Sequence, residues 1–297
     1  MRFALCISLF CLLAASAVAR PAGGPWSPAQ KIDEVNGNSS ELNTPSLDGC
    51  PILSPDGRQL FMASNRPGGH GGLDIWVATR TREDEPFGPP QNLPAPINSA
   101  SDDFCPTPLR GKRLLFVSRR TTSRSCGMGD IYLTRDNPRH GWQDPQHLAC
   151  APEGPNSSLD EQGPSLVEIG GADHLFFSRS SASVPGDIFV SREFGPASAV
   201  SELNTPGNDI QPNVRKDGRE IVFTTNHAHP GAQGAQDLYA STRPSTDAPW
   251  SAPVNLGSAV NTPASETRPS LSWHADTLLF GRLPGPEGSS DIYISTR

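Results

Sequence analysis

The segment Gly72-Leu73-Asp74-Ile75-Trp76 decides the fold, because versions of it return at regular intervals along the chain. The four later copies are Gly129-Asp130-Ile131-Tyr132, Gly186-Asp187-Ile188-Phe189, Gln236-Asp237-Leu238-Tyr239 and Ser290-Asp291-Ile292-Tyr293. Their aspartates are 56, 57, 50 and 54 residues apart. The chain therefore contains five copies of one repeat of roughly 54 residues.

A second pattern keeps the same period. In each copy an asparagine is followed five residues later by an acid, and three residues after the acid by a proline. The asparagines are Asn43, Asn98, Asn156, Asn204 and Asn261, and the acids are Asp48, Asp103, Glu161, Asp209 and Glu266. No copy has an insertion in this block, which predicts the same local structure in all five repeats.

Short apolar segments fill the rest of each repeat. A segment that ends in Phe, such as Leu60-Phe61, follows a turn of the Asp56-Gly57 type, which is common in β-hairpins. A further segment runs from an aromatic residue to an aliphatic one, as in 87–93. Four short strands per repeat and no helical periodicity indicate an all-β, five-bladed β-propeller of four-stranded antiparallel blades.

The ends of the chain predict how the ring closes. The segment 26–32 has the pattern of an outer strand, whereas the C-terminal repeat stops one strand short. We therefore expect the N-terminal strand to join the last blade, which removes two exposed strand edges. The expected propeller covers 26–297, with blades at approximately 43–93, 98–148, 156–200, 204–256, and 261–297 together with 26–32.

The first residues are typical of a secretory signal. Arg2 precedes an apolar stretch, and Ala17-Val18-Ala19 fits a cleavage site, so we expect a signal peptide at 1–19 and a short leader at 20–25. We expect a periplasmic or secreted monomer with no membrane span after cleavage. A net charge of −7 with no basic run argues against nucleic acid as a partner.

Four cysteines follow the expected signal peptide, and an oxidising compartment permits two disulfides between them. Cys50 and Cys105 occupy equivalent positions in neighbouring repeats. Cys126 and Cys150 fall in loops that share one face of the expected blade. The preferred pair is therefore Cys126–Cys150. Cys50 with Cys105 is a further candidate pair, three connectivities stay open, and free thiols are the alternative.

The turn Ser54-Pro55-Asp56-Gly57-Arg58, the Phe strand and the Gly-x-Asp-Ile-Trp segment resemble the WD-like β-propeller repeat. The repeats are similar to those of the C-terminal propeller domain of TolB. The resemblance covers nearly the whole chain after the signal. It implies a propeller fold but no single function, because the repeat occurs in binding platforms, assembly factors and propellers attached to peptidases.

The five repeated acids are the first candidate site, since they lie where the inner strands begin and could ring one mouth of the channel. Such a ring suits a polar ligand or a hard cation such as calcium. The alternative is that each acid accepts backbone N–H bonds in its own turn, with the Asn making a local bond. The residue before the repeated proline varies, and we add Gln211 and Arg268 to the candidate ligand-binding residues.

We interpret the aspartates of the Asp-Ile-Tyr segments, like the five asparagines, as structural residues. These aspartates are Asp74, Asp130, Asp187, Asp237 and Asp291.

No catalytic motif is present. The favoured function is a non-catalytic platform for a protein segment or a small polar ligand, without a cofactor. Two alternatives stay open: a five-bladed glycoside hydrolase or lyase that uses Asp48, Asp103 and Asp209, and a propeller with an axial structural metal ion. Most aromatic residues fall at repeat positions that suit packing between blades, and Trp273 is the main exception.

Overall fold

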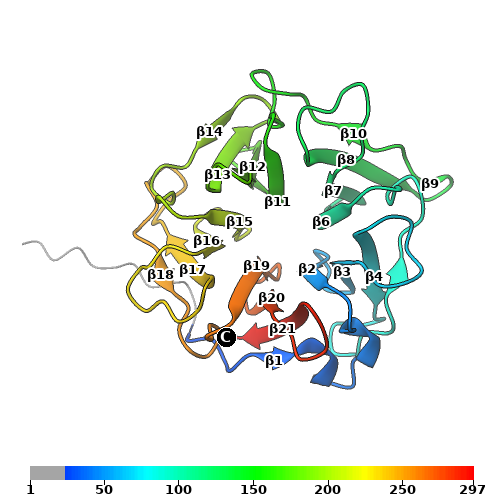
Figure 1. Ribbon diagram of the computed structural model, residues 1–297, viewed down its shortest axis with the longest axis horizontal. Helices are drawn as coiled ribbons and strands as arrows, with labels where there is room; N and C mark the ends of the chain where they lie inside the picture. Colours follow the sequence, from blue (N-terminus) through cyan, green and yellow to red (C-terminus); the bar gives the residue numbers. More distant parts are fainter. Residues whose placement is uncertain (1–23) are drawn as a thin grey trace, which may run out of the picture.

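The computed structural model describes residues 24–297, so the expected signal peptide and most of the short leader lie outside the described residues. No helix among the described residues is long and apolar enough to cross a membrane. Five β-sheets surround one central axis (Figure 1). The prediction of a five-bladed propeller of four-stranded antiparallel blades is confirmed.

Each blade runs from an inner strand at the channel to an outer strand at the rim. The first blade is β2 (Asp48–Leu53), β3 (Gln59–Ser64), β4 (Asp74–Thr79) and β5 (Gln91–Asn92). The second is β6 (Asp103–Leu109), β7 (Arg113–Ser118), β8 (Asp130–Asn137) and β10 (Gln146–His147), with β9 (Gly141–Trp142) also paired to β8. The third is β11 (Asp160–Ile169), β12 (Ala172–Ser180), β13 (Asp187–Arg192) and β14 (Ala197–Ala199). The fourth is β15 (Asp209–Val214), β16 (Glu220–Thr225), β17 (Asp237–Thr242) and β18 (Val254–Asn255).

The fifth blade joins the two ends of the chain. Its strands are β19 (Ser265–Leu271), β20 (Thr277–Leu283), β21 (Asp291–Thr296) and, as the outer strand, β1 (Gln30–Lys31). Gln30 pairs with Ile294 in antiparallel register. The ring therefore closes as predicted, and two short 3-10 turns, η1 (Ile32–Glu34) and η2 (Ser40–Leu42), lead from β1 into the first blade.

Apolar side chains between neighbouring blades form the core. The Phe residues of the second strands are buried: Phe61, Phe116, Phe177, Phe223 and Phe280. Trp250 of the fourth blade packs edge-on against Phe176 of the third, with ring centroids 6.3 Å apart. The repeated apolar positions thus act as inter-blade contacts, which explains why they recur with the period of the blade.

Every inner strand has the same bulge. The pairing register shifts at the residue before the repeated proline, and this residue has a positive φ in all five blades. The five residues are Cys50 (47°), Cys105 (48°), Gly163 (58°), Gln211 (57°) and Arg268 (57°). Proline has no N–H for the ladder, so a bulge at this point lets the inner strand keep its pairing on both sides.

The repeated asparagines link each connecting segment to the strand before it. The Asn98 side chain accepts from the Ile75 N–H at 2.8 Å and donates to the Ile75 carbonyl at 3.0 Å. The other four bond in the same way to the equivalent strand: Asn43 to Ile292, Asn156 to Ile131, Asn204 to Ile188 and Asn261 to Leu238. These bonds reach a strand 16 or more residues away in the sequence. Asn98 and Asn156 also make the expected local bond, to the Leu93 carbonyl at 2.7 Å and the Leu148 carbonyl at 2.8 Å.

The repeated aspartates of the third strands fasten the loop that precedes them. Asp130 accepts from the N–H groups of Cys126 at 2.9 Å and Gly127 at 3.3 Å. Asp74, Asp237 and Asp291 accept backbone N–H groups at the equivalent place. Asp187 follows a shorter loop and has no such bond among the described residues.

Candidate functional site

The five acids at the start of the inner strands are buried inside their turns. Asp48 accepts from the Thr44 N–H and hydroxyl, both at 2.7 Å, and from Arg66 Nη2 at 2.6 Å. Asp103, Glu161 and Glu266 have the same kind of bonds from a Ser or Thr four residues earlier, and each is paired with an arginine of the second strand: Arg120, Arg179 and Arg282. All five residues have 0% exposed surface. Ligand binding by this ring stays a prediction, and the present geometry exposes none of its carboxylates.

Asp209 differs from its four counterparts. Its Oδ2 accepts from the Thr205 N–H at 2.6 Å and hydroxyl at 2.7 Å. Among residues 24–297 no arginine pairs with it, and its Oδ1 is buried without a hydrogen-bond partner. Burial and the Asp209 carboxylate both raise the pKa of Asp187. Each of the other four blades pairs its equivalent acid with an arginine. In the fourth blade the buried carboxylate has no such partner among the described residues.

The channel itself is narrow and positively charged. The Cys50–Cys105 disulfide joins the inner strands of the first two blades, and the lining of the channel also includes Gly163, Gln211 and Arg268. A space of only about 30 Å³ remains between them. Burial, together with the nearby Arg119, lowers the pKa of Arg268 to about 10, and its Nε is buried without a hydrogen-bond partner. A guanidinium in the channel that forms no ion pair with the described acids disfavours the binding of calcium or another cation there.

The opposite mouth of the channel opens into a cavity of about 340 Å³. The turns between first and second strands surround it, and we call it the hairpin cavity. Its lining includes Pro55, Arg110, Glu168, Lys216 and Trp273, one residue from each blade. A volume of this size is within the range of small-molecule sites, which is roughly 300–1,000 Å³.

Two carboxylates lie side by side in the hairpin cavity. Glu168 on β11 and Asp173 on β12 are directly opposite each other in antiparallel register. Opposite residues of this kind have Cβ atoms roughly 4.5–5.5 Å apart. Arg113 Nη1 lies 3.9 Å from Asp173 Oδ2. The Asp173 backbone is fixed, because its N–H donates to Glu193 Oε1 at 2.5 Å and its carbonyl accepts from the Glu193 N–H at 2.8 Å.

Trp273 provides the aromatic surface of the cavity. The Arg110 guanidinium and the Lys216 ammonium each lie 4.2 Å from its ring centroid. Burial lowers the pKa of Lys216, with Arg110 adding to this effect, whereas Glu168 and Asp173 oppose it. The cavity thus combines an aromatic ring, two carboxylates and three cations in one small volume.

The sequence analysis noted Trp273 but missed Glu168, Asp173 and the three cations. They lie at hairpin turns, outside the repeated positions, so the period of the sequence does not mark them. One signal was available, because the turn residues Gly170 and Gly171 predict a hairpin that brings these two acids together.

No family model matches this chain, and no curated protein matches it. Similar solved structures are glycoside hydrolases. A GH43 endo-arabinanase from Bacillus licheniformis has a TM-score of 0.56 at 15% identity, over 85% of this chain and 94% of that one. The catalytic domain of a GH62 α-L-arabinofuranosidase from Coprinopsis cinerea has a TM-score of 0.54 at 14% identity, over 92% and 96%. An α-L-arabinofuranosidase from Lactobacillus brevis has a TM-score of 0.54 at 12% identity, over 86% and 92%.

These findings correct two expectations. The resemblance to WD-like repeats and to TolB is wrong, since no family model supports it and the structural neighbours are five-bladed glycoside hydrolases. The preference for a non-catalytic protein-binding platform is overturned by the same neighbours, which favour the glycoside hydrolase alternative. At these identities the likeness itself establishes the fold.

Proposed function

We propose that this protein is a glycoside hydrolase whose site is the hairpin cavity, with Glu168 and Asp173 as the catalytic pair. The observation that carries the proposal is the placement of these two carboxylates on adjacent strands beside the Trp273 ring. Glycoside hydrolysis requires two carboxyl groups that flank the scissile bond. Aromatic rings with neighbouring polar groups suit the mixed apolar and polar faces of a sugar.

The alternative set of acids fits this chemistry less well. Asp48, Asp103 and Asp209 are fully buried, so a sugar cannot reach them without opening their turns. By contrast, Glu168 is exposed and Asp173 half-buried. For this reason we assign the reaction to the hairpin cavity.

The two carboxyl groups have different surroundings, which suggests their roles. Asp173 faces Arg113 and has a fixed backbone, so it is the group we expect to activate water or attack the anomeric carbon. Glu168 has no ion pair or hydrogen bond among the described side chains, and we expect it to donate the proton to the glycosidic oxygen. The C–O bond to the leaving sugar breaks, and the oxygen of water finally bonds to the anomeric carbon.

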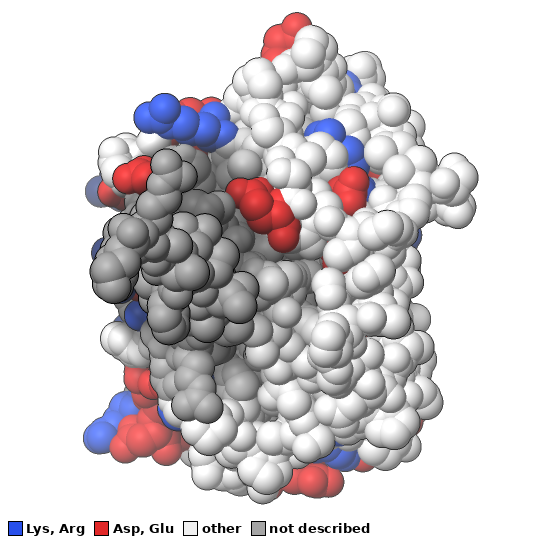
Figure 2. Space-filling view, turned by 90° about the vertical axis from the view of Figure 1, so that its left-hand side faces the viewer, with Lys and Arg blue, Asp and Glu red and all other residues white. Residues whose placement is uncertain are grey.

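The remaining properties follow from the same proposal. We expect a monomer in the periplasm or outside the cell that acts on a carbohydrate without a cofactor. On the side face in Figure 2, the described acidic and basic residues are scattered, with no extended basic patch among those visible. This face offers no electrostatic track for nucleic acid.

The test is hydrolysis of a panel of arabinans, xylans and aryl glycosides by the protein without its signal peptide. Release of reducing ends that the double variant Glu168→Gln/Asp173→Asn abolishes supports the proposal. Glu153→Gln, an exposed acid elsewhere, is the matched control and should leave activity unchanged. Activity that survives the double variant would place the reaction at another site.

A further inference from the structure

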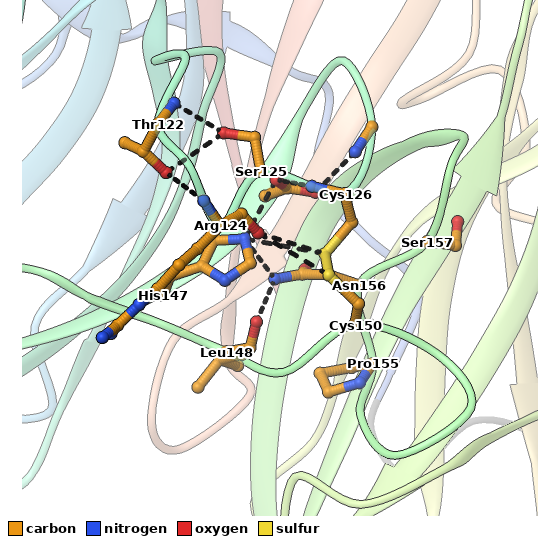
Figure 3. Close-up of a disulfide and its surroundings, with 12 residues drawn as sticks. Thr122, Arg124, Ser125, Cys126, His147, Leu148, Cys150, Pro155, Asn156 and Ser157 are labelled. Carbon is orange, nitrogen blue, oxygen red and sulfur yellow. Dashed lines mark hydrogen bonds and ion pairs between the residues drawn. A yellow bond between two sulfur atoms is a disulfide. The ribbon is translucent and has the colours of Figure 1, made fainter.

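Blade two differs from the other blades at one point of its loop face, where the Cys126–Cys150 disulfide lies beside His147 (Figure 3). Asp130 belongs to the same cluster. The Cys126–Cys150 disulfide joins the loop before β8 to the segment after β10. His147 Nε2 lies 3.8 Å from Cys126 Sγ and 3.0 Å from Asp130 Oδ2. Three side chains with metal-binding atoms thus lie within 4.8 Å of one another.

The histidine is not required to hold Asp130. In the first and fourth blades, an asparagine does this at the equivalent position. Asn92 Nδ2 donates to Asp74 Oδ2 at 3.2 Å, and Asn255 Nδ2 donates to Asp237 Oδ2 at 3.0 Å. An amide therefore satisfies the structural need of the repeat. The imidazole at 147 adds a metal-binding nitrogen, and it does so only in the blade whose loops carry the two cysteines.

We propose that reduction of the Cys126–Cys150 disulfide converts this cluster into a zinc site. Its ligands are the two Sγ atoms, His147 Nε2 and Asp130 Oδ2, a tetrahedral S₂NO set that suits Zn²⁺. A dithiol reductant supplies two electrons and two protons, and is itself oxidised to a disulfide. The cysteines then lose their protons to solvent when they bind the metal as thiolates.

Two of the distances between the ligand atoms already approach those of a tetrahedral site. With zinc–ligand bonds of about 2.0 to 2.3 Å, neighbouring ligand atoms are about 3.3 to 3.8 Å apart. The Nε2–Oδ2 and Nε2–Sγ distances of 3.0 and 3.8 Å require only small adjustments. The main movement is the separation of the two sulfurs after their bond breaks. Asn156 Nδ2, 3.4 Å from His147 Nε2, must give up that contact.

The Cys126–Cys150 disulfide is also more accessible to a reductant and a metal ion than the Cys50–Cys105 disulfide. Cys126 and Cys150 are half-buried, and a surface cavity borders His147 and Cys150, so a reductant and a metal ion can enter. Cys50 and Cys105 are each only 5% exposed, and no histidine belongs to their surroundings in the channel. The second disulfide therefore serves as an internal control.

The experiment is a titration with Co²⁺, a spectroscopic probe for zinc, of oxidised protein and of protein reduced with a dithiol that is then removed without air. We expect one Co²⁺ per chain, a sulfur-to-cobalt charge-transfer band, and displacement by Zn²⁺, all in the reduced protein only. His147→Asn keeps the bond to Asp130 and should weaken Co²⁺ binding at least about 100-fold. The double variant Cys50→Ala/Cys105→Ala should bind as the parent does.

Three results would overturn the proposal: no charge-transfer band after reduction, equal binding by oxidised protein, or unchanged affinity in His147→Asn. If reduction unfolds the protein, added Zn²⁺ must restore a cooperative thermal transition. Failure to restore it would also reject the site. None of these outcomes depends on hydrolytic activity.

Discussion

Asn43 and Ile292 are 249 residues apart in the sequence and share two hydrogen bonds. The Ile292 N–H donates to Asn43 Oδ1 at 2.7 Å, and Asn43 Nδ2 donates to the Ile292 carbonyl at 3.2 Å. The same clamp acts within each of the other blade connections. Here it also holds the first blade to the last, so it helps to close the ring.

Asn43→Ala should therefore destabilise the whole propeller. Two buried backbone groups of Ile292 lose their partners, at a cost of roughly 2–4 kcal/mol in the free energy of unfolding. Equilibrium urea unfolding measures this loss. Asn36→Gly is a suitable control, since Asn36 is exposed with a φ of 55°, and it should change stability by less than about 0.5 kcal/mol. An equal effect of both variants would show that the two Asn43–Ile292 hydrogen bonds do not stabilise the propeller.

The acids of the first and fourth blades should respond differently to neutralisation. Asp48→Asn leaves the buried Arg66 without its carboxylate, and we expect a loss of roughly 3–5 kcal/mol in unfolding free energy. Asp209→Asn removes a buried charge that has no cationic partner, so we expect a change within about 1 kcal/mol. Urea unfolding of both variants at pH 7 makes the comparison. A larger loss of unfolding free energy in Asp209→Asn than in Asp48→Asn would contradict the interpretation that Asp209 has no cationic partner.

Glu161 should make stability depend on pH. Burial raises its pKa from 4.5 to about 7, although hydrogen bonds from Ser157 and the charge of Arg179 oppose the shift. Because the folded-state pKa is the higher one, this stabilising contribution is complete below about pH 4.5 and is lost as the pH rises through about 7. Its size is roughly 3 kcal/mol at most. The difference in unfolding free energy between the parent protein and Glu161→Gln should fall from pH 4 to pH 8, whereas a constant difference would contradict the shift.

Replacing Arg268 with methionine should stabilise the protein. The unpaired charge in the channel disappears, and the methionine side chain keeps much of the packing volume, so the free energy of unfolding should rise by roughly 1–3 kcal/mol. Arg124→Met, at an exposed position, is the control. Thermal and urea unfolding provide the measurement. A clear destabilisation by Arg268→Met would mean that the guanidinium has a favourable partner in solution.

The fold could be predicted because its signals are periodic. Every blade must solve the same problems, so the Asn, the acid, the Pro and the Asp-Ile-Tyr segment recur at fixed spacing and define the strands. The Cys126–Cys150 disulfide could be predicted for another reason, because the antiparallel topology places the two loops on one face of the blade. Cys50 and Cys105 occupy one repeat position in neighbouring blades, and the structure contains both Cys50–Cys105 and Cys126–Cys150.

The candidate site could not be predicted in the same way. Glu168, Asp173 and Lys216 come from turns that differ between blades, and only the closed ring brings them to Trp273. The repeated acids attracted attention because they recur, yet recurrence marks a structural need of the blade. The partners of Asn43 likewise depend on ring closure, which local sequence does not contain.

The most direct test of the central claim is the effect of Glu168→Gln on kcat/KM for the glycoside that the protein cleaves best. The account predicts a fall of about 10²- to 10⁴-fold with no change in the melting temperature, because the variant loses the proton donor and keeps the fold. A kcat/KM within about twofold of the parent would contradict the assignment of catalysis to the hairpin cavity.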